Sequence, residues 1–266
     1  MPTAPSAEAP TAMIDRVASL LEVFDGHQRL TLAQISRRSQ LPPSSAHRIL
    51  QRLVELGWIE RERFEYHLGI RMFELGSQVV RRDGVHQAAL PLLHHLHRST
   101  GLTVHLSALM GPDVLHLERI GAWPEAGDCW QLGARQPTVH SAAGRALLAQ
   151  LDEAQWPTLT YPSPVTAGGV TSPAQLRDDI ALVRARGGVA VDAQYCCAGV
   201  TAAAAAIGPP EGGLRAALSL CGPAENLPVD KAVAAVRRAA QDIWFAASGV
   251  THRYGRTTSL GVAAAG

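Results

Sequence analysis

The chain has 266 residues and a formal net charge of +1, with 47% hydrophobic and 18% charged residues. This length allows one large domain or two of ordinary size, and the apolar content argues against a largely disordered chain. Because the total charge is nearly neutral, nothing global indicates nucleic-acid binding, and such a function must rest on local charge.

Cysteine usage and the two ends of the sequence bear on the compartment. The four cysteines include an adjacent pair and no CxxC spacing, which favours a reducing cytoplasm over a disulfide framework. No run of about 18 uncharged apolar residues occurs, and the first ten residues lack the parts of a signal peptide. We therefore expect a cytoplasmic protein with no membrane partner, a disordered tail over residues 1–11 and a flexible tail over residues 251–266.

The first 57 residues predict three helices. Residues 13–27 have apolar side chains at helical spacing, and Gly26 is the expected stop. A short second helix follows, with Thr31 as its cap. After the break SQLPPSS, a third helix carries an apolar stripe and ends at Gly57, and we expect Ser44 or Ser45 to satisfy its first N–H groups.

Three helices joined by tight turns, with the second pair closely spaced, are typical of a helix-turn-helix. The next stretch, WIERERFEYHLG, predicts two short strands with a charged tip between them, although no Asn-Gly or Asp-Gly turn marks the tip. We therefore predict a winged helix-turn-helix domain over residues 12–69.

The polar side of the third helix is a candidate DNA-binding surface. Arginine and glutamine can read base edges, and serine or arginine near a helix start can contact phosphates. The alternative is a solvated face, as on most amphipathic helices. The predicted DNA-binding residues are Ser44, Ser45, His47, Arg48, Gln51 and Arg52 on the helix, and Arg61 and Arg63 in the wing.

Residues 70–84 predict a connector helix, and the second domain is expected over residues 85–250. It opens with a helix that contains Pro91 and stops at Gly101, followed by a hairpin. Further helices are predicted over residues 141–151, 172–188 and 228–249, and three apolar runs lie between the last two. This mixture of strands, hairpins and helices indicates an α+β regulatory domain without a nucleotide-binding glycine motif.

The histidines of the second domain allow a metal site or a structural role. His94 and His97 have the one-turn spacing of zinc ligands, but neither His86 nor a cysteine completes a familiar spacing. We expect no metal and no other cofactor. His105 and His116 fall in the predicted hairpin, where packing or cross-strand hydrogen bonds are the expected role.

An enzyme requires a nucleophile and a base. Cys196, Cys197 and Cys221 are available, yet no local pattern places a base beside a thiol, and all three lie in apolar segments where a thiol pKa rises. We therefore expect no catalytic residues. An architectural DNA-binding protein without a ligand is disfavoured because the second domain is large and apolar.

Taken in order, these segments resemble the IclR family of bacterial transcription regulators. The blocks that carry the resemblance are LTLAQISRRSQLPPSSAHRILQRLVELGWIER, LGARQPTVHSAAGRALLA, LVRARGGVAVD, GVTAAAAAI and ALSLCGP. The resemblance extends over roughly residues 12 to 248. It implies a GAF-like C-terminal domain that binds a small-molecule effector. It also implies a homodimer or homotetramer on a palindromic double-stranded DNA operator.

The resemblance also implies the residues of an effector pocket. They fall on Gly133, Ala134, Asp192, Ala202, Ser219 and Cys221. Ser219 and Cys221 lie two apart in a predicted strand and so point to one face. Free backbone N–H groups near Gly133 and Ala134 are expected to hold a carboxylate.

Two departures from the family pattern affect the choice of ligand. Gln194 and Tyr195 stand where many members have acidic residues, and Ala202 replaces a cysteine or serine. An effector of the small keto-acid type is therefore not implied. Trp123 and Trp130 either line a larger apolar pocket or belong to the core or an interface.

Overall fold

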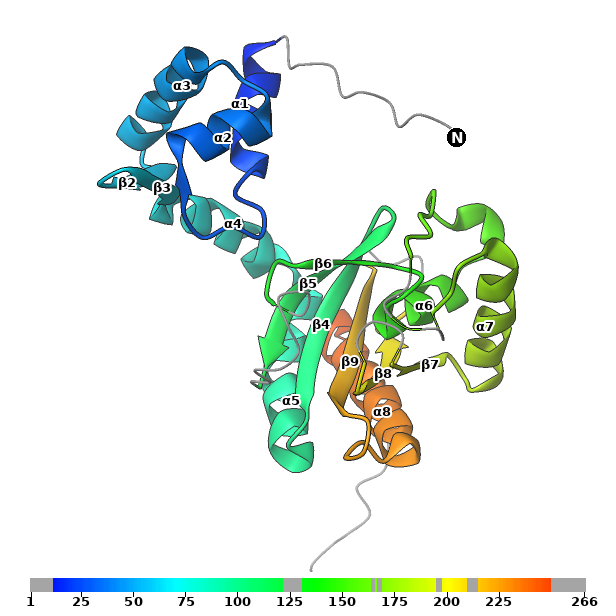
Figure 1. The fold of residues 1–266 in the computed structure, drawn as a ribbon. Coiled ribbons are helices and arrows are strands. Elements are labelled where there is room, and N and C mark those ends of the chain that lie inside the picture. Colours follow the sequence, from blue (N-terminus) through cyan, green and yellow to red (C-terminus); the bar gives the residue numbers. More distant parts are fainter. Residues whose placement is uncertain are drawn as a thin grey trace, which may run out of the picture. The chain divides into compact units, whose positions relative to one another are not determined.

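The computed structural model describes residues 12–121, 131–163, 166, 169–194, 198–209 and 215–249. The chain divides into two compact units, Met1–Arg82 and Asp83–Gly266 (Figure 1). The two predicted tails lie outside the described residues. The sequence predicts a connector over residues 70–84, and the helix found there ends at Arg82.

The first unit combines four helices with a three-stranded antiparallel sheet. In chain order its elements are α1 (Met13–Glu22), β1 (Leu30–Thr31), α2 (Leu32–Ser39), α3 (Pro43–Glu55), β2 (Ile59–Glu62), β3 (Glu65–Leu68) and α4 (Ile70–Arg82). The strand order is β1-β3-β2, so the predicted two-stranded wing gains a third strand from the segment before α2. Leu20, Ile35, Leu50 and Ile59 belong to one buried core that joins α1, α2, α3 and the wing.

The helix starts follow from capping chemistry. The Gln34 N–H donates to the Thr31 hydroxyl and the Thr31 N–H donates to the Gln34 side chain, which is the predicted cap of α2. The prediction of a serine cap for α3 is wrong. Pro42 is the N-cap, Pro43 is the first helical residue and no side-chain cap bond forms there. A proline in the first turn gives up an N–H that needs no helical partner, so neither serine is required.

The described residues of the second unit form a six-stranded antiparallel sheet and four α-helices. In chain order its elements are α5 (Gly84–Thr100), β4 (Thr103–Met110), β5 (Asp113–Ile120), β6 (Arg135–Pro137), α6 (Ala142–Ala149), the 3-10 helix η3 (Glu153–Gln155), α7 (Pro173–Ala185), β7 (Val189–Ala193), β8 (Val200–Ala206), β9 (Ala216–Pro223) and α8 (Val229–Ser248). The strand order is β6-β5-β4-β9-β8-β7. This is an α+β domain, as predicted.

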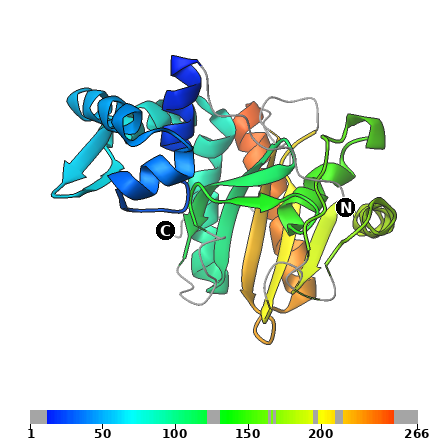
Figure 2. The same cartoon turned by 45° about the horizontal axis from the view of Figure 1, so that its top comes forward.

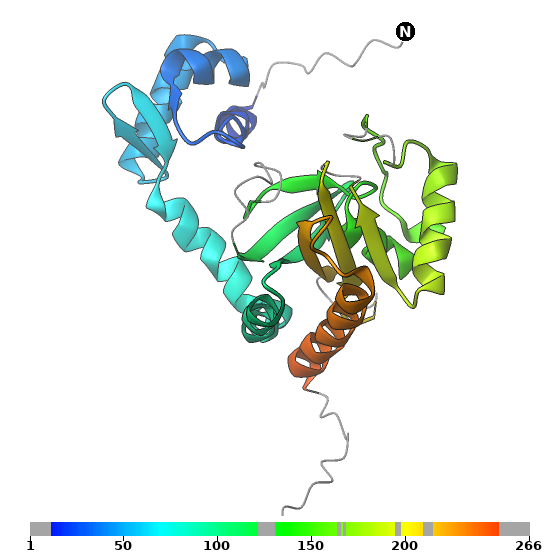
Figure 3. The ribbon, with the colours of Figure 1, turned by 60° about the horizontal axis from the view of Figure 1, so that its bottom comes forward.

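The two faces of this sheet have different covers. Helices α5 and α8 lie side by side on one face (Figure 3), where Leu93, Leu218 and Val236 share a core. Helix α6 packs on the other face through residues such as Ala146 and Leu147. Helix α7 packs against α6 and the β7 edge (Figure 2). We call the side that α6 partly covers the α6 face.

Strand β8 is unusual because its last five residues, 202–206, are all alanine. Ala203 and Ala205 belong to the core under α5 and α8, whereas Ala202 and Ala204 belong to the core of the α6 face. Because the side chains of β8 are small on both faces of the sheet, the larger side chains that fill the two cores come from the neighbouring elements. Within the described residues, no helix combines the length and the apolarity that a membrane crossing requires.

Candidate functional site

Helix α3 presents a polar face suited to DNA contact. Ser44, Arg48 and Gln51 are exposed, and Ser45 and His47 are half-buried. The opposite side of the helix is anchored in the core by Ala46, Ile49, Leu50 and Leu53. The local pattern of the sequence therefore separates buried from polar residues, and the polar set keeps its donors and acceptors at the surface.

Arg52, also predicted to contact DNA, has different surroundings from the rest of the set. Its Nη1 atom lies 2.8 Å from Glu55 Oε2, and both side chains are largely exposed. With Arg48, it also borders a mainly apolar groove of about 460 Å³ between α1 and α3, which Met13, Val17 and Trp58 help to line. Because the Arg52 guanidinium is paired with Glu55, Arg48 is better placed than Arg52 to contact DNA.

The wing carries mixed charge rather than a basic surface. Arg61 donates from Nε to the carbonyl of Arg63 at 3.0 Å, and its guanidinium carbon lies 5.5 Å from the centre of the Tyr66 ring. Arg29, which precedes β1, pairs with Glu62 and has Nη1 3.9 Å from Glu65 Oε2. Both predicted arginines are exposed, but only Arg63 extends from the turn itself.

Three rows of side chains cross the α6 face, because cross-strand partners of an antiparallel sheet point to one side. The first row is Asp192, Ala202, Cys221 and Thr103. The second row is Ala190, Ala204, Ser219, His105 and Arg119. The third row is Ala206, Ala217, Ser107 and His116. Four of the six predicted effector residues therefore lie in adjacent positions of the first two rows.

Sequence reasoning did not assign five polar members of these rows to the site: Thr103, His105, Ser107, His116 and Arg119. The two histidines do face each other, as one of their predicted roles requires, with ring centres 5.0 Å apart. Ser107 Oγ lies 2.8 Å from His116 Nδ1, and Cys221 Sγ lies 3.5 Å from His105 Nδ1. Alternation along each strand shows which residues share a face of that strand. It does not show which residues of neighbouring strands lie opposite each other, because that depends on the register between the strands.

The charges around Cys221 converge on the same part of the sheet. Burial raises the pKa of the Cys221 thiol to about 12, while the Arg119 guanidinium acts to lower this pKa and the Asp192 carboxylate acts to raise it. Both charged groups therefore lie within electrostatic range of the sulfur. A thiol with this pKa stays protonated at neutral pH and is a poor nucleophile.

Burial of so many polar groups has a physical cost. Asp192 is 2% exposed, Ser219 4% and His105 0%, and the opposite face of the same strands is filled by aliphatic side chains. A buried polar group destabilises a fold unless it is hydrogen-bonded, and Cys221–His105 and Ser107–His116 are two of the contacts that meet this need on the α6 face. A concentration of convergent polar groups beside a small-residue floor is typical of a ligand site.

The loop before β6 corrects one expectation. The N–H of Gly133 donates to the His116 carbonyl at 2.8 Å, and the N–H of Ala134 donates to the Gln131 carbonyl at 3.0 Å. The prediction that these two groups are free to hold a carboxylate is therefore wrong. The Gly133 donor fastens the loop to the edge of β5, the Ala134 donor closes a turn within the loop, and Gly133 adopts a φ of +81°.

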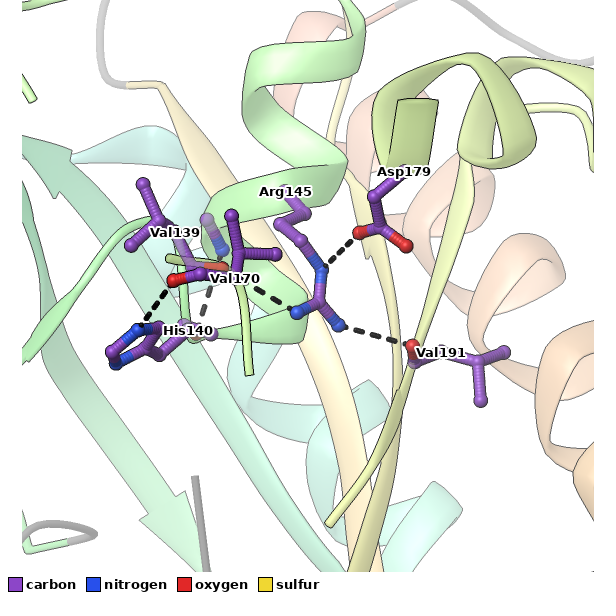
Figure 4. A network of polar contacts seen from close by, with 8 residues as sticks. Val139, His140, Arg145, Val170, Asp179 and Val191 are labelled. Carbon is purple, nitrogen blue, oxygen red and sulfur yellow. Dashed lines mark hydrogen bonds and ion pairs between the residues drawn. The ribbon is translucent and has the colours of Figure 1, made fainter. Parts of the chain in front are cut away.

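A fully buried arginine links three elements near Asp192 (Figure 4). Arg145 of α6 has its Nε 2.8 Å from Asp179 Oδ2 of α7, and its Nη2 donates to the Val191 carbonyl of β7 at 3.0 Å. A longer contact of 3.4 Å joins its Nη1 to the Val139 carbonyl. These contacts of Arg145 could not be predicted from the sequence, because the block GRALLA indicates only a helix.

Several residues considered from the sequence remain outside this description. Trp123, Trp130, Cys196 and Cys197 lie outside the described residues. In the part of the chain that the structure describes, no three histidine, cysteine, aspartate or glutamate side chains are grouped to hold a metal. The His97 Nδ1 atom lies 2.8 Å from the Leu102 carbonyl, which gives that ring a local structural contact.

A winged helix with an exposed polar recognition helix, joined to a domain with a polar sheet face, defines a DNA-binding regulator with an effector domain. The model of the C-terminal domain of the bacterial transcriptional regulator IclR matches residues 77–244, and the IclR helix-turn-helix model matches residues 13–63. The chain belongs to the IclR family. Its relatives are named as transcription regulators and repressors, so it is a regulator and not an enzyme.

Relatives and solved structures match over most of their length. The chain is 32% identical to the regulator BhcR of Paracoccus denitrificans (strain Pd 1222) over 79% of this chain and 77% of that protein. It is 27% identical to the transcriptional repressor IclR of Escherichia coli (strain K12), over 93% and 94%. An IclR homolog from Microbacterium hydrocarbonoxydans, complexed with 4-hydroxybenzoate, has a TM-score of 0.77 and 30% identity, with 90% of this chain and 100% of that one covered.

Proposed function

We propose that this regulator is a cytoplasmic repressor that binds a palindromic operator as a homodimer or homotetramer and responds to a small organic acid. The three polar rows of the α6 face are the observation that carries the sensing role. An effector that binds one conformation of the second domain better than another shifts the population of DNA-binding states. Two α3 helices of a dimer would then meet half-sites about 34 Å apart, or a multiple of that distance.

In this proposal α3 reads bases in the major groove. Arg48 and Gln51 lie on the exposed polar side and have the chemistry to bind guanine and adenine edges. Ser44, Ser45 and His47 lie near the start of the helix, where phosphate contacts are common. Arg52 and Arg61 act as secondary contacts, because each already has a protein partner.

The proposed effector site comprises Asp192, Ala202, Ser219 and Cys221, and the rows add His105 and Arg119 to it. Gly133 and Ala134 stay in the proposal only through their position beside His116 at the edge of β5. Arg119 of β5 and Asp192 of β7 carry opposite charges on either side of β4, β9 and β8. A ligand with a carboxylate at one end and a hydroxyl donor at the other matches both charges.

The solved relative with 4-hydroxybenzoate gives the first compound to test. Melting temperatures of the full chain would be measured with 4-hydroxybenzoate, benzoate and phenol. A ligand that binds the native state raises the melting temperature with concentration, and the hydroxy acid should give the largest rise. Equal shifts with all three compounds would contradict recognition of both ends.

A matched pair of serine variants tests the position of the site. Ser219→Leu should place a bulky apolar side chain in the second row and remove the ligand response, while DNA binding persists because the recognition helix lies in the other unit. Ser248→Leu, at an exposed position of α8, should respond as the wild type does. A folded Ser219→Leu protein with a full response would place the site elsewhere, and its melting curve without ligand establishes that it is folded.

A further inference from the structure

Phe64 occupies the end of the wing and is 79% exposed. Two other large apolar side chains of the hairpin are buried, Ile59 with 0% and Tyr66 with 3% exposed, and Leu68 at the far end of β3 is 45% exposed. Glu62 pairs with Glu65 across the strands, so Arg63 and Phe64 alone form the turn. The hairpin therefore places its most exposed large apolar side chain at its tip. Single exposed apolar residues are common on protein surfaces, so the position of this one matters more than its exposure.

The turn that carries Phe64 is held in one conformation. Arg63 has a φ of +57°, a region where glycine is usual and other residues are strained. Its carbonyl accepts a hydrogen bond from Arg61 Nε at 3.0 Å, and Arg61 also lies over the Tyr66 ring. Arg61 thus supports the turn that carries Phe64 through a hydrogen bond to its backbone.

The charges beside the turn permit approach to DNA only in a particular way. Glu62 and Glu65 flank the turn and would be repelled by phosphates. Arg29 compensates both, since it pairs with Glu62 and lies 3.9 Å from Glu65. Three arginines, Arg29, Arg61 and Arg63, therefore stand against two carboxylates, and the tip is attracted to a polyanion. Because Phe64 lies at the tip, its apolar ring would be the first group of the wing to enter a groove.

We propose that Phe64 is a wedge that the wing inserts into the minor groove of duplex DNA, where it unstacks one base step and bends the duplex. Apolar side chains with this role push between bases that a protein has reached through electrostatic attraction. Flexible pyrimidine–purine steps such as TA and CA/TG are the expected targets, since they unstack most easily. Phe64 then contributes sequence preference at a step that α3 does not read. This proposal rests on operator binding by the winged helix.

The test uses the full chain and a duplex that the wild-type protein enriches from a random 40-base-pair pool. DNA bending is measured by gel mobility of circularly permuted fragments. Unstacking is measured by the fluorescence of 2-aminopurine placed at successive positions of the enriched duplex. Phe64→Ala should reduce the bend angle to less than half, abolish the local rise in fluorescence and weaken affinity roughly tenfold. Phe64→Leu should keep a bend, because it retains an apolar wedge.

Ile14→Ala is the matched control, since Ile14 lies on α1 in the same unit and is 80% exposed. It should leave the bend angle and the fluorescence rise unchanged. Phe64→Ala with a wild-type bend and fluorescence overturns the wedge, even if affinity falls, because a surface contact would explain the loss of affinity. Failure of the wild-type protein to enrich any duplex would overturn operator binding itself, and the wedge with it.

Discussion

Arg145 and Cys221 are both almost fully buried, but the physical consequences of their burial differ. The guanidinium of Arg145 is surrounded by one carboxylate and two carbonyl oxygens, so its charge is compensated from three elements. The thiol of Cys221 is kept neutral by the same low-dielectric interior. Each of these environments leads to a measurable prediction for the free energy of unfolding.

Replacement of Arg145 by methionine should lower the free energy of unfolding by about 3–5 kcal/mol, because it leaves a carboxylate and two carbonyls without their partner. Arg177→Ala is the control: its pair with Glu153 is 2.9 Å long but half-exposed, and its loss should cost no more than about 1 kcal/mol. Urea unfolding of both variants measures the difference. Equal losses would mean that the Arg145 network adds nothing beyond an ordinary surface pair.

Cys221 should make stability depend on pH in the alkaline range. An unfolded thiol has a pKa of about 8.5, and burial raises the pKa in the native state to about 12. Between these values the unfolded chain loses a proton that the native chain keeps. The stabilisation is therefore complete below pH 8.5 and declines as the pH rises, by up to about 1.4 kcal/mol per pH unit. Urea unfolding at pH 7 and pH 10 should show a larger loss for the wild type than for Cys221→Ala. Equal losses of stability in the wild type and in Cys221→Ala would contradict a raised pKa for the Cys221 thiol.

At the scale of elements, α3 and the wing divide the work of DNA binding. Arg48→Ala should cost about 1–3 kcal/mol on the enriched duplex and relax preference at one base pair, as expected for loss of a bidentate base contact. Arg52→Ala should cost less, because Glu55 already holds its guanidinium. Quantitative binding assays on the duplex and its single-base variants check this order. If Arg52→Ala has the larger effect, α3 lies differently in the groove.

The wing arginines should act on all sequences alike. Arg63→Ala should lower affinity for specific and random duplexes by similar factors and reduce the salt slope of binding by about 0.9. Arg61→Ala should show a smaller electrostatic effect and disturb the turn that it braces. Titrations at several salt concentrations measure both slopes. An effect of Arg63→Ala confined to one sequence would indicate base reading by the wing.

Elements with strong local signals could be predicted from the sequence, and those defined by partners could not. Thr31, Ser141 and Ser172 cap their helices as expected, since a cap is a contact over three residues. Strands β1 and β6 have two and three residues and are too short to show alternation. The site also depends on contacts between strands. Asp192 and Ser219 could be proposed individually from the sequence. Arg119 and His105 lie beside Ser219 only because of the register between β5, β4 and β9. The pairing of Arg145 depends on α7, more than thirty residues away.

At the scale of the whole molecule, helix α4 offers a surface for self-association. Ile70 and Phe73 lie three residues apart on the same side of α4 and are 65% and 71% exposed, which is unusual for two neighbouring large apolar side chains. We expect a second copy of the chain to cover them. Ile70→Glu combined with Phe73→Glu should lower the sedimentation coefficient towards that of a monomer and weaken operator binding. Val229→Glu, at a less exposed apolar position on α8, is the control and should sediment as the wild type. An unchanged coefficient in the double variant would place the interface elsewhere.

The five alanines of β8 have a consequence for folding. A shift of this strand by two residues would exchange one methyl group for another at most alanine positions, so this run carries almost no information about alignment. The flanking residues set the alignment: Val200, at the start of the strand, enters the α6-face core, and Ile207, just after it, enters the core under α5 and α8. We therefore expect β8 to shift along β9 during folding until both flanking residues are buried. The docking of this strand should be a late step, and misaligned intermediates should accumulate if either flanking residue is truncated to alanine.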